Sequence, residues 1–215
     1  MEKDLGKYRM SYQKNELSID SMSENPMEIF KDWFAEAELH GGNIEPNAMT
    51  LATVDENGMP RSRVVLLKKF TGEGFVFYTN YKSNKGQAIE KNPMVCLSFY
   101  WHKLERQIII QGKASKLPKN ISDKYFESRP DGSKLGAWAS EQSMVVTSRE
   151  YLEGELKKYE EKFKDAEIPR PLHWGGYLVL PEVIEFWQGR PNRLHDRIKY
   201  TLQKDFDWKI ERLAP

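Results

Sequence analysis

The first forty residues show two patterns of polar and hydrophobic positions. Residues 1–25 are polar and rich in Ser, Asn and Lys, which predicts a mobile N-terminal arm with one short helix near residues 5–13. From Pro26 the apolar residues recur at helical spacing until Gly41 interrupts them, so a helix that packs on a core is expected there. The arm is thus expected to precede one folded domain that spans residues 26–215.

Beyond the first helix, short apolar runs separated by turn residues predict strands. Asn57-Gly58 is a clear turn, because these residue types accept the positive φ angles of tight hairpins. The expected strands cover residues 49–54, 61–70, 75–79, 93–101, 105–117, 175–180, 183–188, 193–202 and 208–213. Further helices are expected at residues 83–91, 119–128, 133–140 and 148–164. This pattern indicates a mainly β protein with peripheral α-helices (α+β), built as an antiparallel barrel or sandwich.

Charge and composition exclude several classes of function. Lys plus Arg total 33 and Asp plus Glu total 32, so the net charge of +1 gives no global positive field for nucleic acid, although local basic pockets are compatible with it. No apolar run reaches the ~18 residues of a membrane helix, and the N-terminus lacks the apolar core of a signal peptide. The single cysteine, Cys96, lies in an apolar run and is expected to be a structural thiol in a cytoplasmic protein.

Common nucleotide-binding and hydrolase motifs are missing, and the four His residues are too scattered to predict a metal site. The strongest local feature is the run I-E-F-W-Q-G-R-P-N-R-L-H-D-R, which ends at Arg197. In an extended segment residues two apart share a face, which would place Arg193, His195 and Arg197 together. Such a cationic row suits a wet surface or a bound anion. The residues alone leave a solvated edge strand and an anion site equally open.

Three other segments suit phosphate but are ambiguous singly. Arg63 and Lys68 lie five residues apart, so a regular strand would point them to opposite faces. They meet one ligand only if the strand is bulged or lies between two binding surfaces. The alternative, which the segment alone favours, is that both are strand-end residues whose charges extend into solvent. Lys85 stands at the start of an expected helix, where free backbone N–H groups suit phosphate and ordinary capping is the alternative. Tyr125 and Arg129 lie four residues apart, on one face of an expected helix. Arg129 either binds a phosphate there or lies at an ordinary helix end on the surface.

Taken together, these segments resemble the pyridoxine (pyridoxamine) 5′-phosphate oxidase family from about residue 9 to residue 215. The most specific piece is I-E-F-W-Q-x4-R-L-H-D-R. Further pieces match in order: R-V-V-L-L-K, F-Y-T-N, W-H-x-L-E-R-Q, Y-F-x-S-R-P, G-A-W-x-S-x-Q-S and the terminal R-L-A-P. The resemblance implies an FMN-binding split β-barrel and a homodimer with FMN at the subunit interface.

The resemblance also implies which side chains contact the ligands. The residues implied for FMN are Arg63, Val64, Val65, Leu66, Leu67, Lys68, Tyr78, Thr79, Asn84, Lys85, Gln107, Gln142, Ser143, Trp187 and Arg197. Those implied for a phosphorylated substrate are Arg9, Tyr12, Lys68, Tyr125, Arg129, Ser133, Arg193 and His195. One position departs from the family, which usually has Arg or Lys where this chain has Asn84, beside the FMN phosphate. Lys85 remains, so FMN binding is expected to survive, with an affinity that loss of a charge-assisted contact can lower.

The activity implied is that of a flavoprotein oxidoreductase in vitamin B6 metabolism. Pyridoxine or pyridoxamine 5′-phosphate would be oxidised to pyridoxal 5′-phosphate while O2 is reduced to H2O2. Arg193 and His195 would be the catalytic residues at the reacting end of the substrate, and His195 either relays a proton or only hydrogen-bonds the substrate oxygen. Two alternatives are a split-barrel reductase that uses a nicotinamide or deazaflavin partner, and a non-enzymatic flavin or pyridoxal-phosphate binding module. A second phosphate site favours the oxidase over the reductase.

Overall fold

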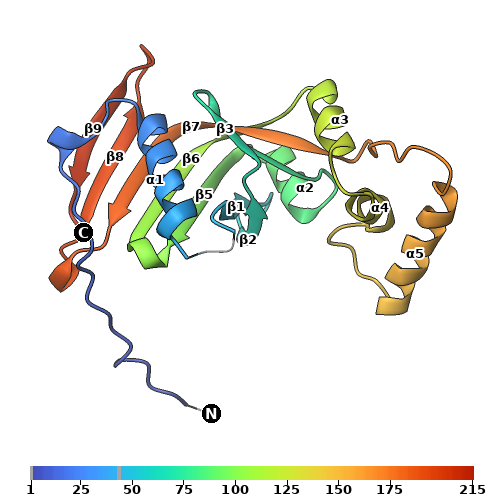
Figure 1. The fold of residues 1–215 in the computed structure, drawn as a ribbon, viewed down its shortest axis with the longest axis horizontal. Helices are drawn as coiled ribbons and strands as arrows, with labels where there is room; N and C mark the ends of the chain where they lie inside the picture. The colour runs from blue at the N-terminus through green and yellow to red at the C-terminus, as the bar shows by residue number, and fades with distance from the viewer. Residues whose placement is uncertain (1, 43–44) are drawn as a thin grey trace. The chain divides into compact units, whose positions relative to one another are not determined.

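The computed structural model describes residues 2–42 and 45–215 (Figure 1). Its contacts divide the chain into two compact units that each combine separate stretches of sequence. Unit 1 comprises Met1–Thr50, Cys96–Gln111 and Pro181–Pro215, and unit 2 comprises Leu51–Val95 and Gly112–Leu180. The expectation of a single domain from residue 26 stays a prediction. None of the helices in the described ranges is long and apolar enough to cross a bilayer.

The structure is mainly β, with helices around the strands, as the sequence predicts. The strands are β1 Ala48–Val54, β2 Pro60–Leu66, β3 Lys69–Thr71, β4 Gly74–Asn80, β5 Met94–Trp101, β6 Arg106–Lys116, β7 Trp174–Gln188, β8 Asp196–Leu202 and β9 Trp208–Leu213. They pair in the order β2-β1-β5-β6-β7-β4-β3, with β8 on β7 and β9 on β8. The helices are α1 Pro26–His40, α2 Asn84–Lys91, α3 Lys119–Glu127, α4 Asp131–Ala139 and α5 Arg149–Lys162, and the 3-10 turns are η1 Ile19–Ser21, η2 His102–Leu104 and η3 Pro191–Arg193.

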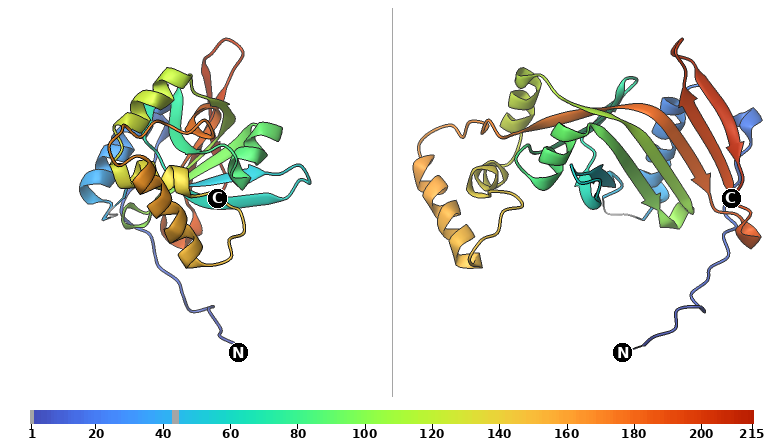
Figure 2. Two further views of the ribbon diagram at one scale, coloured as in Figure 1. Left: turned by 90° about the vertical axis from the view of Figure 1, so that its right-hand side faces the viewer. Right: turned by 180° about the vertical axis from the view of Figure 1, so that it is seen from behind.

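Unit 1 contains the C-terminal hairpin and the first helix. β7 pairs antiparallel with β8 through residues 183–188, and β9 continues the ladder (Figure 2). Asn25 caps the start of α1, and Trp33 of that helix packs edge-on against Phe186 of β7. The guanidinium of Arg106 lies 4.3 Å from the Trp33 ring centroid and bonds Glu36 at 2.7 Å. The buried face of α1 therefore packs against apolar side chains and against the largely buried guanidinium of Arg106 from β6.

Unit 2 holds the antiparallel ladder of β3, β4 and the first half of β7. Every residue of β4 is buried except Tyr78, which is half-buried. Ser83 caps α2 by accepting a hydrogen bond from the Gly86 amide at 3.4 Å. Further along, α4 and α5 pack through Trp138, whose ring lies 5.6 Å from that of Tyr159. The Ser83 hydroxyl also donates to the carbonyl of Asn80, the last residue of β4, at 2.7 Å, which ties the end of β4 to the start of α2.

The N-terminal arm departs from the prediction. No helix forms over residues 5–13, and the arm's helical turn in the described chain is η1. The reason lies in the backbone amides of Gln13 and Lys14, which donate to the carboxylate of Glu105 at 2.8 and 3.1 Å. A distant side chain thus takes donors at the end of the segment and favours an extended path.

The expected strand over residues 61–70 is wrong as one element, because it breaks between β2 and β3. Leu67 turns into the core with 4% exposure, and the Lys68 amide donates to the Val76 carbonyl at 2.8 Å. Conversely, the two strands expected around Pro181 form the single strand β7. The β4 ladder ends at Val179 and the β8 ladder begins at Val183, so neither ladder needs the N–H that proline lacks.

The expected strand from Arg193 begins only at Asp196. Asn192 and Arg193 have φ angles of 57° and 61°, in the left-handed region. Side chains do not alternate regularly through such a turn. The argument that put Arg193, His195 and Arg197 on one strand face is therefore wrong for the residues before Asp196.

Candidate functional site

A cleft of about 630 Å³ in unit 2 collects most of the ligand residues expected in that unit. Its lining includes Arg63, Val64, Val65, Leu66, Lys68, Tyr78, Thr79, Lys85, Tyr125, Arg129, Ser133 and Gln142. These side chains come from β2, β4, α2, α3, α4 and the loops that follow β2, α3 and α4. Leu67 does not line the cleft, because its side chain points into the core.

The break after β2 explains how Arg63 and Lys68 reach the same cleft. The strand ends at Leu66, so strict alternation no longer sets the direction of Lys68. The spacing of the two residues required a bulge or two binding surfaces, whereas the structure interrupts the strand between Leu66 and Lys69.

The start of α2 forms the first cationic group in this cleft. Lys85 Nζ donates to Gln142 Oε1 at 2.9 Å, and the Thr79 hydroxyl donates to the same oxygen at 3.3 Å. The backbone N–H of Asn84 donates to the Ser143 hydroxyl at 3.3 Å. Burial, followed by the charges of Arg63 and Arg61, lowers the pKa of Lys85 to about 8. A bound anion would relieve this repulsion at the helix start, where phosphate is commonly held.

Arg129 forms the second cationic group. Its guanidinium lies 4.5 Å from the Trp174 ring centroid, and burial lowers its pKa. One terminal nitrogen, Nη1, is buried and has no hydrogen-bond partner among the described residues. A buried unsatisfied guanidinium N–H is costly, so this atom marks a place for an acceptor from a ligand. Ser133 lines the cleft beside it, and Tyr125 stacks on Tyr78 with centroids 3.8 Å apart.

The reacting-end residues expected from the C-terminal run lie in unit 1. The rings of Trp187 and His195 are 4.7 Å apart, and Tyr12 contacts both with centroids at 5.8 Å. His195 Nδ1 accepts a hydrogen bond from the Arg190 amide at 3.0 Å. Burial and then the charge of Arg193 lower the pKa of His195. Because the amide can only donate, Nδ1 carries no proton, and the imidazole in this arrangement is neutral with its proton on Nε2.

The other expected residues of unit 1 are less closely grouped. Arg197 pairs with both carboxylate oxygens of Glu185, at 2.7 and 3.1 Å, which raises its pKa. Arg193 is exposed, Gln107 is half-buried in β6, and Arg9 is exposed with its Nε donating to the Gly6 carbonyl at 3.1 Å. The arm therefore brings Tyr12, and not Arg9, against His195.

Two residues that matter to this geometry were missed from the sequence. Glu105 is 6% exposed, and its carboxylate holds the arm just after Tyr12 by accepting the hydrogen bonds from the Gln13 and Lys14 backbone amides. Its only sequence signal is its place in W-H-x-L-E-R-Q. Arg61 stands two residues before Arg63 on β2 and acts electrostatically on Lys85. Its signal would have been the same strand alternation that was applied to the C-terminal run.

The antiparallel half-barrel defines a split β-barrel protein, and its cleft in unit 2 carries two cationic groups. Residues 35–163 match the family described as pyridoxamine 5′-phosphate oxidase, and residues 174–215 match the pyridoxine 5′-phosphate oxidase C-terminal dimerisation region. The chain belongs to the pyridoxine/pyridoxamine 5′-phosphate oxidase family.

Relatives of that name align with nearly the whole chain. The protein from Flavobacterium johnsoniae is 61% identical over 98% of this chain and 99% of its own, and that from Flavobacterium psychrophilum is 60% identical over 99% and 100%. Among solved structures, PhzG from Burkholderia lata, in complex with tetrahydrophenazine-1-carboxylic acid, has a TM-score of 0.85 at 30% identity, over 91% of this chain and 95% of that one. A related FMN-binding protein from Nostoc punctiforme shares the fold, with a TM-score of 0.71 at 16% identity over 90% and 100% of the chains.

Proposed function

We propose that the protein is an FMN-dependent oxidase that converts pyridoxine or pyridoxamine 5′-phosphate to pyridoxal 5′-phosphate and reduces O2 to H2O2. The observation that carries this proposal is the pair of cationic groups in one cleft, around Lys85 and around Arg129. FMN and the substrate each carry one phosphate, so two separate anion sites are what the reaction needs. Membership of the oxidase family and the 60–61% identical relatives support the same activity.

The residues present fit FMN at the first group. Arg63, Lys85 and the hydroxyl of Thr79 would hold its phosphate near the start of α2. When bound, FMN supplies a two-electron acceptor that O2 can reoxidise. Gln107, Trp187 and Arg197 of unit 1 are proposed as further FMN contacts in a homodimer with FMN at the subunit interface. The match of the C-terminal region to a dimerisation region supports the homodimer.

The substrate phosphate fits the second group. Arg129 offers its unsatisfied Nη1–H, with Ser133 and Lys68 along the same cleft. Arg193 and His195 are proposed for the reacting end of the substrate, with Tyr12 as the cover from the arm. Because His195 is neutral with its proton on Nε2, its geometry supports hydrogen-bond donation to the substrate oxygen over acceptance of a proton at that nitrogen. The single cysteine is compatible with the cytoplasm, which is the proposed location.

The direct test is a product assay on the full chain. The protein is incubated with FMN, O2 and pyridoxine 5′-phosphate, and H2O2 and pyridoxal 5′-phosphate are both measured; equal amounts of the two are expected. Unphosphorylated pyridoxine is the matched control and should react far more slowly, because Arg129 then lacks its anion. Bound FMN with neither product would sink the oxidase proposal, and flavin reduction by a nicotinamide instead would favour the reductase.

A further inference from the structure

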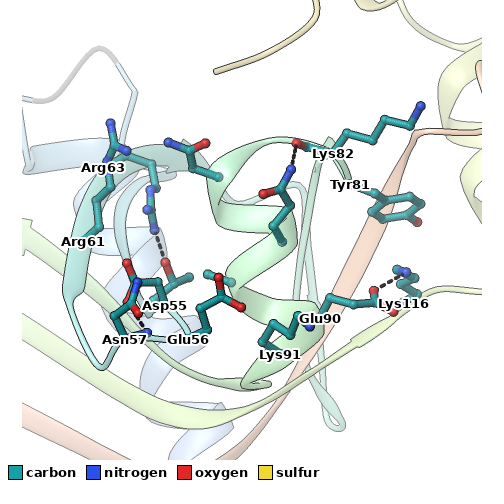
Figure 3. A pocket seen from close by; sticks show the side chains of 14 residues that line it. Asp55, Glu56, Asn57, Arg61, Arg63, Tyr81, Lys82, Glu90, Lys91 and Lys116 are labelled. Carbon is teal, nitrogen blue, oxygen red and sulfur yellow. Dashed lines mark hydrogen bonds and ion pairs between the residues drawn. The ribbon is translucent and has the colours of Figure 1, made fainter. Parts of the chain in front are cut away.

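A second cleft lies in unit 2, on the other side of Arg63. It has a volume of about 650 Å³, and its lining includes Arg61, Arg63 and Asn84 (Figure 3). Arg61 and Arg63 are two apart on β2, so their side chains leave the same face of the strand. Arg63 lines both clefts, so the second cleft borders the proposed phosphate site at this residue.

The described carboxylates that line this cleft do not pair with Arg61. Arg61 makes no hydrogen bond or ion pair with the residues that the structure describes, although three carboxylates line the same cleft. Asp55 Oδ1 accepts the Asn57 and Met59 amides at 2.9 Å each, and Glu90 pairs with Lys116 at 2.5 Å. The third carboxylate, Glu56, makes no ion pair with Arg61.

The charge of Arg61 acts on the residues already assigned to phosphate. After the effect of burial, it lowers the pKa of Arg63, and together with Arg63 it lowers the pKa of Lys85. Arg63 is held in place by the Thr53 hydroxyl at 2.8 Å and the Leu51 carbonyl at 3.1 Å, both of which are neutral. Three cations therefore repel one another here, and among the described residues no carboxylate of the cleft forms an ion pair with Arg61 or Arg63.

The neighbouring position at the start of α2 is neutral. Asn84 is the first residue of the helix, and its side chain lines the cleft that Arg61 also lines. The Asn84 side chain is neutral, so this position adds no cation at the start of α2. Arg61 of β2 adds one to the same cleft. We propose that Arg61 is an FMN phosphate-binding residue, which takes from β2 the place that a cation at position 84 would take from α2. This inference rests on the proposed function.

The test is a flavin titration of the full-length protein after removal of flavin, followed by flavin fluorescence. Arg61→Gln is expected to weaken FMN binding about tenfold to a hundredfold, because a contact between charged groups is lost. Riboflavin, which lacks the phosphate, should bind Arg61→Gln and the unchanged protein equally. Adding Asn84→Arg to Arg61→Gln should restore most of the FMN affinity, since it returns a cation to the same cleft.

The matched control is Lys91→Gln. Lys91 lines the same cleft but is the last residue of α2. The substitution therefore removes the same unit charge at the far end of the helix. It should leave FMN affinity unchanged. An equal loss of FMN affinity in Lys91→Gln and Arg61→Gln would show that the net charge of the cleft, and not a specific contact from Arg61, favours FMN. That result would overturn the inference.

The remaining outcomes separate this inference from the proposed function. If the unchanged protein fails to bind FMN, the proposed function and the inference both fail. If the unchanged protein binds FMN and Arg61→Gln binds it as tightly, the inference alone fails. A parallel loss of FMN and riboflavin binding would also overturn it, because the phosphate would then not be the group that Arg61 contacts.

Discussion

Replacing Glu105 by Gln should release the N-terminal arm while leaving the fold intact. The Glu105 carboxylate accepts the amides of Gln13 and Lys14, and the residue is 6% exposed, so solvent screens these bonds little. Gln keeps an acceptor oxygen but removes the charge. Hydrogen bonds to charged groups contribute roughly 1.5–3 kcal/mol against ~1 kcal/mol for neutral ones, so two bonds lose about 2 kcal/mol.

Hydrogen exchange measures this effect at the two amides concerned. A loss of about 2 kcal/mol corresponds to a roughly 30-fold faster exchange of the Gln13 and Lys14 amides. Glu16→Gln is the matched control, because its side chain is 76% exposed and its pairing with Arg190 at 3.2 Å should contribute little. Unchanged protection of the two amides in Glu105→Gln would refute the reasoning, since the carboxylate would then not be what holds the arm.

Three further predictions follow from other parts of the structure. Arg193→Ala should lower turnover strongly and still purify yellow with flavin; a colourless protein that lost only FMN would contradict its assignment to the substrate. FMN affinity should fall as the pH rises above about 8, where Lys85 loses its proton, and Lys85→Met should not show this fall. The folded apoprotein releases this buried proton more readily than the unfolded chain, so its free energy of unfolding should rise between about pH 8 and 10.5. The same pH dependence of FMN affinity in both proteins would count against Lys85. Arg106→Met should lower the free energy of unfolding by about 1–3 kcal/mol, because Gln188 loses its buried donor, whereas exposed Arg149→Met should change little in the same denaturant titration.

Local pattern predicted most elements, because their signals lie within a few residues. The Ser83 cap, the Pro26 start of α1 and the strands between turns all follow from neighbouring side chains. The errors fall where distant residues decide. The arm adopts an extended path because Glu105, 92 residues from Gln13, takes its amide, and no periodicity in residues 1–25 reveals that partner.

The site shows the same division. Motif resemblance gave the composition of the cleft, including Lys85 and Arg129, but not its geometry. Strand alternation failed at Lys68, because β2 ends before it, and at Arg193, because a left-handed turn precedes β8. Arg61 was missed because no motif includes it, and its effect appears only when β2 and α2 are placed around one cleft.

Glu105 also makes the arm and the end of β7 thermodynamically dependent on each other. Its carbonyl accepts the Gly189 amide at 2.7 Å and the Gln188 side-chain amide at 3.2 Å, while its carboxylate holds the arm. A Cβ at Gly189 would come within 2.7 Å of the Tyr12 ring, so the two segments also exclude any side chain between them. By reciprocity, the factor by which a ligand at this end of β7 favours arm docking equals the factor by which the docked arm favours binding of that ligand.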